Sequence, residues 1–181
     1  RVLRWLLVSS LAIALAALVL AYPLCLVELV ARFGVRGAAL SGLALCAIPL
    51  SALLARRGVP RTALATSLGV PGVFALVLAT GDARALRLVP AVVNLGIALF
   101  VAESLRGGGS LIERAARWMV PEAPDFIGPY CRRVTLLWSL FFGASAAAIA
   151  ALALFGSDAA WRSASGTGLI ALMLALTALE F

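Results

Sequence analysis

Residues 134–155 of this chain read VTLLWSLFFGASAAAIAALALF, a run of 22 residues that contains no charged side chain. An α-helix of that length extends about 33 Å, which matches the roughly 30 Å hydrocarbon core of a bilayer. Comparable apolar stretches lie on either side of this run, at residues 5–27, 37–55, 62–80, 86–102 and 163–181. The sequence therefore predicts an all-α, polytopic membrane helical bundle with about six transmembrane helices.

The composition of the whole chain supports the same class. Its 181 residues are 64% hydrophobic and their mean hydropathy is +1.09, whereas a soluble domain is about half apolar. We find no internal repeat, and we treat residues 1–181 as a single transmembrane domain. The chain begins at Arg1 and stops at Phe181 inside an apolar run, so we expect it to be a fragment of a longer protein.

Residue types that are missing from the chain exclude several kinds of chemistry. The sequence has no His, Lys or Gln and a single Asn. Without His there is no Ser-His-Asp or Cys-His arrangement and no His general base, and without Lys there is no Schiff base. The three cysteines, Cys25, Cys46 and Cys131, are scattered and form no CxxC pair. The sequence predicts no metal site, no cofactor and no catalytic residue.

Arginine is distributed unequally between the two sides that the spans define. Ten of the 15 arginines fall on the side of the N-terminus, and five fall on the opposite side. Because cytoplasmic loops carry an excess of Arg and Lys, we predict a multi-pass protein with a cytoplasmic N-terminus. The formal charge of +7 is common in such proteins and does not indicate nucleic-acid binding. On the outer side, residues 83–85 are expected to form a short turn.

The cytoplasmic loop at residues 103–133 holds nine of the 23 charged residues. Within it, Ser110 and Glu113 have the spacing of a capping box, in which the Ser hydroxyl accepts from the Glu amide and the Glu side chain reaches back. We therefore predict a short amphipathic helix from Leu111 to about Val120, where a proline follows. A helix resting on the lipid surface and a recognition element for an acyl chain or an anionic headgroup both fit this pattern. Its apolar face comprises Leu111, Ala115, Trp118 and Met119.

Several side chains in and near this loop are candidates for binding a partner or a phosphate group. Arginine is suited to bidentate recognition of phosphate or carboxylate, although arginines at a span end also act as topology anchors. The glycines at 107–109 fit either a phosphate-binding loop or a flexible linker. Inside the membrane, Asn94 is the only amide and is expected to hydrogen-bond a neighbouring helix. The candidate partner- or phosphate-binding residues are Arg106, Glu113, Arg114, Arg117, Tyr130, Arg132, Arg133 and Trp138.

Several short motifs occur together in the second half of the chain. They are Val89-Pro90-Ala91-Val92-Val93-Asn94-Leu95, Ile112-Glu113-Arg114-Ala115-Ala116-Arg117, Tyr130 and Arg132-Arg133-Val134-Thr135. Over roughly residues 88–181 the chain resembles a family of small, uncharacterised bacterial inner-membrane proteins. Members of that family are encoded beside acyl carrier proteins, ketosynthases, acyltransferases and lipid exporters, in clusters similar to those for aryl polyene pigments. The chain departs from the family at Cys131, where a Thr is usual.

The resemblance implies a location in the bacterial inner (plasma) membrane and a role near acyl-group chemistry. The leading hypothesis is a non-catalytic, lipid-associated accessory subunit of an acyl-transfer or lipid/polyene export machinery, which docks its partners through the cytoplasmic loop. The implied partners are membrane lipids and an acyl carrier protein, an acyltransferase or a lipid exporter. The alternatives are a small lipid or metabolite transporter with a cavity around Asn94, and an interfacial lipid-modifying enzyme with Glu113 or Asp125 as general base.

Overall fold

The fold is entirely helical in the part of the chain that the computed structural model describes. That part comprises residues 2–55, 61–119, 124 and 126–180. Within it, side chains are described for Tyr22 and from Cys25 onward, except at residues 61, 62, 119 and 180. Seven α-helices and two 3-10 helices follow one another along this part of the chain, which confirms the predicted all-α fold there.

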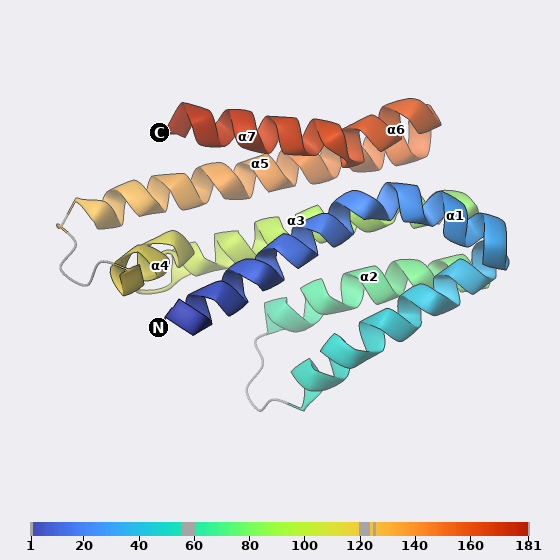
Figure 1. The fold of residues 1–181 in the computed structure, drawn as a ribbon, viewed down its shortest axis with the longest axis horizontal. Helices are drawn as coiled ribbons and strands as arrows, with labels where there is room; N and C mark the ends of the chain where they lie inside the picture. The colour runs from blue at the N-terminus through green and yellow to red at the C-terminus, as the bar shows by residue number, and fades with distance from the viewer. Residues whose placement is uncertain (1, 56–60, 120–123, 125, 181) are drawn as a thin grey trace.

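Helix α1 (Val2–Leu54) contains both of the first two predicted spans. Its backbone leaves the helical conformation at Gly34, where φ is +69° and ψ is 173°. This combination of angles is essentially restricted to glycine. It turns the second arm of α1 back toward the end of the molecule at which the first arm begins (Figure 1). A bend at one glycine therefore separates the two arms, within the residues 28–36 that lie between the two predicted spans.

The next elements show that the connection near residue 83 is more ordered than a simple turn. Asp82 Oδ1 accepts a hydrogen bond from the Arg84 amide at 2.8 Å and so caps a 3-10 helix. Pro90 follows in the first turn of the next α-helix, where its missing N–H removes no helical hydrogen bond. The elements are α2 (Arg61–Thr80), η1 (Ala83–Leu88), α3 (Val89–Glu103) and η2 (Ser104–Arg106).

The last four helices differ in length from the predicted elements. Helix α5 begins at Ile127, ahead of the predicted span, and Pro129 fits in its first turn. The predicted last span is divided at Gly166 into two helices, and the Ser157 hydroxyl caps the first of them by accepting from the Ala160 amide at 3.3 Å. The elements are α4 (Leu111–Met119), α5 (Ile127–Phe155), α6 (Asp158–Ser165) and α7 (Thr167–Glu180).

The helices run back and forth between two ends of the molecule (Figure 1). The start of α1, helix α4, the start of α5 and the end of α7 lie toward one end, which we call the α4 end. The bend of α1, the 3-10 helix η1 and helix α6 lie toward the other, which we call the η1 end. The α4 end thus gathers the segments for which the arginine distribution predicts a cytoplasmic location.

Several helices are suited to crossing a membrane. Within the described part of the chain, five stretches are long and apolar enough, namely Cys25–Leu54, Ala63–Thr80, Ala83–Arg106, Ile127–Phe155 and Asp158–Leu179. They indicate a multi-pass membrane protein. The predicted first span, at residues 5–27, lies for most of its length outside the residues whose side chains are described, so the count of six spans stays a prediction.

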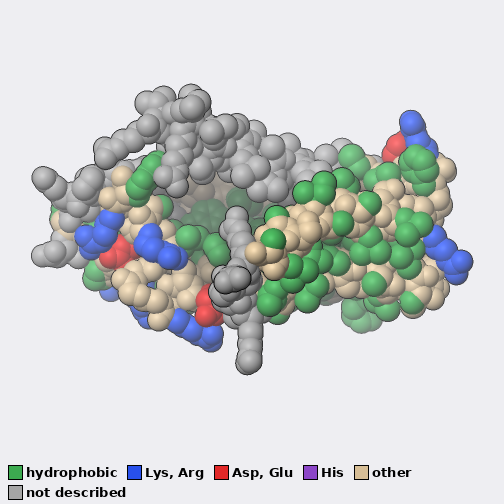
Figure 2. Space-filling view, turned by 90° about the horizontal axis from the view of Figure 1, so that it is seen from below, with side chains coloured by type: hydrophobic (Ala, Val, Ile, Leu, Met, Phe, Trp, Pro, Cys, Tyr) green, Lys and Arg blue, Asp and Glu red, His purple; other side chains and the backbone are tan. Residues whose placement is uncertain are grey.

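The buried core is concentrated toward the η1 end. Six of its side chains, contributed by α1, α2, η1, α5 and α6, are at most 3% exposed: Ala39, Val77, Leu86, Ile149, Ala153 and Trp161. Between the two ends, large apolar side chains are exposed on the surface, and charged side chains gather at the ends (Figure 2). An apolar belt between charged ends is the surface that a lipid bilayer favours.

Candidate functional site

Helix α4 begins where the sequence predicts. The Ser110 hydroxyl accepts a hydrogen bond from the Glu113 amide at 3.2 Å, which satisfies one of the free N–H groups at the start of the helix. The Glu113 carboxylate accepts a hydrogen bond from Arg117 Nε, 2.9 Å away and one turn further along. The Ser110 half of the predicted capping box is therefore confirmed, and the Glu113 carboxylate is engaged by Arg117.

Two contacts attach α4 and the start of α5 to the end of α3. The Leu111 amide donates to Ser104 Oγ at 3.1 Å. Arg132 Nη1 donates to the Leu105 carbonyl at 3.0 Å. Because these bonds join segments that are separate along the chain, η2, the start of α4 and the first turns of α5 are held together at the α4 end.

The five arginines predicted as binding residues lie at this end and differ in their partners. Arg106 and Arg117 are each paired with an acidic side chain one turn away. Arg132 gives one of its N–H groups to a backbone carbonyl. Arg114 and Arg133 are exposed and form no ion pair with any side chain that the structure describes. The α4 end therefore presents three guanidinium groups, those of Arg114, Arg132 and Arg133, that no carboxylate in the described part of the chain neutralises.

Of the two aromatic candidates, only Tyr130 lies beside these arginines. Tyr130 is in the first turn of α5 and is 47% exposed. Trp138 lies about 12 Å further along the same helix. Its ring centroid is 5.7 Å from that of Phe141 and 5.8 Å from that of Phe142. Trp138 thus belongs to an aromatic cluster in the apolar part of α5, and the structure does not bring it to the arginine group.

Asn94 is buried inside the bundle, where it is 1% exposed. Its side-chain amide donates to the Pro90 carbonyl, 2.8 Å away in the same helix, which corrects the expectation of a bond to a neighbouring helix. A short polar side chain reaches the carbonyl one turn earlier more easily than a second helix. Its Oδ1 atom has no hydrogen-bond partner among the described residues, and Asn94 is not in the lining of four cavities between them.

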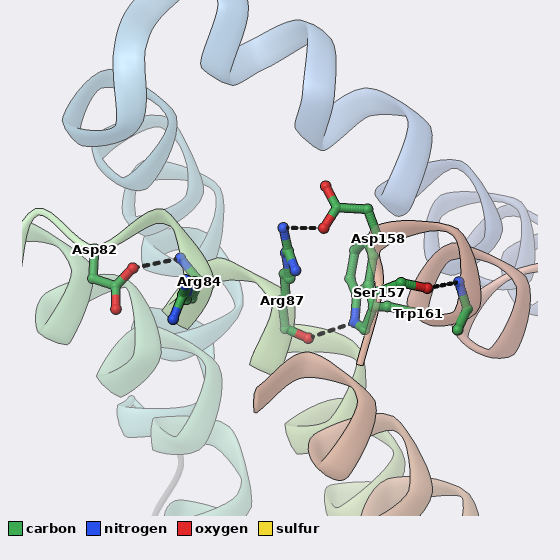
Figure 3. Close-up of polar contacts among 7 residues, drawn as sticks. Asp82, Arg84, Arg87, Ser157, Asp158 and Trp161 are labelled. Carbon is green, nitrogen blue, oxygen red and sulfur yellow. Dashed lines mark hydrogen bonds and ion pairs between the residues drawn. The ribbon is translucent and has the colours of Figure 1, made fainter. Parts of the chain in front are cut away.

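A second polar cluster, which the sequence reasoning missed, joins η1 to α6 (Figure 3). Arg87 Nη2 lies 2.6 Å from Asp158 Oδ1, and the guanidinium carbon of Arg87 lies 6.0 Å from the ring centroid of Trp161. The Trp161 indole N–H donates to the Arg87 carbonyl at 3.1 Å. Asp158 follows the Ser157 cap in the first turn of α6, where the helix dipole also favours a carboxylate. These contacts attach α6 to the core.

Tyr22 extends this cluster to α1. Its hydroxyl donates to the Leu86 carbonyl at 2.9 Å. The same carbonyl also accepts from the Val89 amide at the end of η1, so the hydroxyl is its second donor. The cap at Ser157 is visible in the sequence, but no local pattern predicts that residues 74 positions apart, Arg87 and Trp161, meet.

The class of protein that these observations define is a multi-pass helical membrane protein with a polar, structured group at each end. No protein-family model, curated protein or solved structure matches the chain. The resemblance to the bacterial inner-membrane family therefore stays an expectation, and any specific function has to be argued from the residues at the two ends.

Proposed function

We propose that this chain is a non-catalytic accessory subunit of an acyl-transfer or lipid-export machinery in a bacterial inner membrane. In this proposal the N-terminus and α4 face the cytoplasm, and the α4 end docks a soluble partner. The observation that carries the proposal is the arginine group at the α4 end, which is attached to α3 through Arg132 and through the Leu111 amide. Attachment to the bundle keeps these side chains on one surface instead of on a free loop.

The charge of this surface suits an acidic partner. Residues 103–133 contain five arginines and four acidic residues, a net charge of 5 − 4 = +1. Two of these arginines are already paired with acidic side chains, so Arg114, Arg132 and Arg133 are the ones that support docking. Charge complementarity of this kind favours encounter and correct orientation. The partner class that the resemblance implies, an acidic acyl carrier protein, fits this requirement.

Charge reversal at Arg133 tests the docking proposal. The chain would be reconstituted in nanodiscs, and its affinity for the acyl carrier protein of the same organism would be measured by fluorescence anisotropy. We expect Arg133→Glu to weaken binding about tenfold, because the reversal removes one attraction and adds one repulsion, each worth up to about 1 kcal/mol at an exposed site. Added salt should weaken wild-type binding as well, because it screens exposed charges.

Arg162→Glu provides the matched control for this experiment. Arg162 is also exposed and forms no ion pair within the described part of the chain, but it lies at the η1 end. We expect its reversal to leave the affinity unchanged. Equal weakening by both variants, or no weakening by Arg133→Glu, would contradict docking at the α4 end.

A lipid or metabolite transporter is the second candidate, because one cavity of the bundle suits an apolar ligand. This cavity has a volume of about 300 Å³ and is walled almost entirely by apolar groups from both arms of α1, from α2 and from α3. Its lining includes Tyr22, Phe74 and Pro90 but not Asn94, so it differs from the cavity that the transporter hypothesis expects. Movement of a fluorescent phospholipid across proteoliposomes without any partner would favour transport over an accessory role.

The interfacial-enzyme alternative has no such support. Its proposed general base, Glu113, is held by Arg117 at 2.9 Å. The other candidate base, Asp125, lies outside the described residues. We therefore retain the accessory role as the leading proposal and the transporter as the second.

A further inference from the structure

The contact between α2 and α3 loosens toward the α4 end. A Cβ atom on Gly69 would lie 2.7 Å from Val92 Cγ1, so the two helices are in close contact there. Nearer the α4 end, a Cβ on Gly96 would lie 3.8 Å from Thr66 Cβ, which is an ordinary contact. Two cavities, of about 330 and about 280 Å³, occupy this region, and Thr66 and Glu103 line both of them.

These cavities combine polar groups at the α4 end with apolar side chains along α3. The larger cavity is lined by Arg114 and the glycines at 107–109, together with the Phe100 ring. The smaller is lined by Arg106 at one end and by side chains such as Leu99 along the helix. Their sizes are near the lower limit of about 300 Å³ for small-molecule pockets, which are mostly apolar with a few polar groups. A ligand that fills this space must be amphipathic.

The polar part of this space has the electrostatic character of an anion site. Glu103 is paired with Arg106 at 3.1 Å, whereas Arg114 forms no ion pair within the described part of the chain. Arg114 therefore contributes a positive charge that no described carboxylate neutralises. The start of α4, a nine-residue helix, adds the partial positive charge of a helix N-terminus. A Cβ on Gly108 would meet no atom within 4 Å, so there is room for a ligand beside this backbone.

We propose that this α2–α3 groove, defined by Thr66, Leu99, Phe100, Arg106 and Arg114, binds one anionic phospholipid. The phosphate lies beside Arg114 and Arg106, and one acyl chain lies along the apolar side chains of α3. The phosphodiester carries a negative charge that can pair with the Arg114 guanidinium group. The acyl chain buries apolar surface against the side chains of α3. This inference does not rest on partner docking, which is tested at Arg133.

The test measures lipid binding to the purified chain in detergent. Native mass spectrometry would follow the number of bound lipids during titration with phosphatidylglycerol or with phosphatidylcholine, and with inorganic phosphate as a competitor. We expect one phosphatidylglycerol per chain, bound more tightly than phosphatidylcholine and not displaced by phosphate alone. Arg114→Ala should weaken phosphatidylglycerol binding about tenfold, the loss expected for one charge-assisted hydrogen bond. Equal binding of the two lipids to the wild-type chain would overturn the proposal.

A second variant tests the apolar part of the groove without changing its charge. Ala65 is exposed on α2 and lines the smaller cavity, so Ala65→Phe should fill the space for an acyl chain and abolish lipid binding. Ala147→Phe is the matched control, because Ala147 is exposed on α5 and lines neither cavity. Circular dichroism would establish that both variants fold. Unchanged phosphatidylglycerol binding in folded Ala65→Phe would contradict the inference.

The two proposals fail separately in these experiments. Arg133→Glu should weaken partner binding and leave the bound phosphatidylglycerol unchanged, because Arg133 lines neither cavity. Ala65→Phe should remove the lipid and leave partner binding unchanged. Displacement of the lipid by inorganic phosphate alone would identify a free phosphate site and exclude the lipid that we propose.

Discussion

At the scale of single residues, a tyrosine hydroxyl joins two segments that are far apart in the chain. The Leu86 carbonyl accepts a hydrogen bond from the Val89 amide at the end of η1, and a carbonyl oxygen has a second lone pair that can accept another. In an apolar environment a hydroxyl without a hydrogen-bond partner is costly. The Tyr22 hydroxyl donates to this carbonyl at 2.9 Å, and it thereby joins α1 to η1. The hydrogen bond explains why a half-buried tyrosine occurs in an otherwise apolar stretch.

Removal of the Tyr22 hydroxyl tests this role. We expect Tyr22→Phe to lower the free energy of unfolding by about 1 kcal/mol, the net value of one hydrogen bond. The measurement is an SDS titration of the chain in mild detergent, followed by circular dichroism. Tyr130→Phe is the control, because Tyr130 is 47% exposed and its hydroxyl makes no hydrogen bond within the described part of the chain. A comparable loss in Tyr130→Phe would argue against a specific bond at Tyr22.

At the scale of elements, Gly34 decides the path of α1. The helix contains two apolar stretches, and the sequence between them, residues 28–36, has three charged side chains but no proline. The backbone at Gly34 adopts a positive φ of +69°, which a residue with a Cβ adopts only at a cost. A Cβ at this position would meet no atom within 4 Å, so the restriction comes from the backbone and not from packing.

Substitution of glycine by alanine should therefore have opposite effects at Gly34 and Gly72. Gly34→Ala should lower the free energy of unfolding by about 1–3 kcal/mol, the cost of a strained backbone conformation. Gly72 lies inside α2, and a Cβ there would also meet nothing within 4 Å. Because glycine is less favourable than alanine inside a helix, Gly72→Ala should raise the free energy of unfolding by about 0.5–1 kcal/mol. The same SDS titration measures both. Equal effects would show that the bend does not depend on the glycine.

At the scale of the whole molecule, packing and charge are distributed differently between the two ends. The residues of the buried core lie mainly toward the η1 end, where Trp161 is 3% exposed. Toward the α4 end, α2 and α3 leave the cavities that Arg114 and Arg106 line. The η1 end therefore holds most of the buried core, and the α4 end has the cavities and exposed arginines on which both proposals rest. The proposed orientation places this second end in the cytoplasm.

Labelling of single cysteines tests that orientation. In a chain whose three native cysteines are replaced by alanine, Gly108→Cys marks the α4 end and Ala83→Cys marks the η1 end; both positions are exposed. In cells with a permeabilised outer membrane, a membrane-impermeant maleimide should label Ala83→Cys, whereas Gly108→Cys should react only after lysis. We expect this pattern because the side of the α4 end carries the excess of arginine, which predicts a cytoplasmic location. The reverse labelling pattern would show that the α4 end faces outward.

Part of the candidate site was predictable because it depends on neighbours in the sequence. The Ser110 cap and the pairing of Glu113 with Arg117 involve residues three and four positions apart, and such spacing sets their geometry on a helix. The hydrogen bond from Arg132 to the Leu105 carbonyl joins residues 27 positions apart, and no short spacing in the sequence predicts it. Both aromatic candidates lie in α5, where Tyr130 is one turn from Arg132 and Arg133 and Trp138 is about 12 Å further along the helix.

The sequence by itself determined the helical membrane class and the start of α4. These features follow from runs of apolar residues and from a local cap, which act within one element. Tertiary structure alone decided that Arg87 meets Trp161, and that the contact between α2 and α3 loosens from Gly69 toward the α4 end, where the two cavities lie. The reason is physical: apolar periodicity says which residues avoid water, but the partner of each helix face depends on the shapes of side chains far apart in the chain.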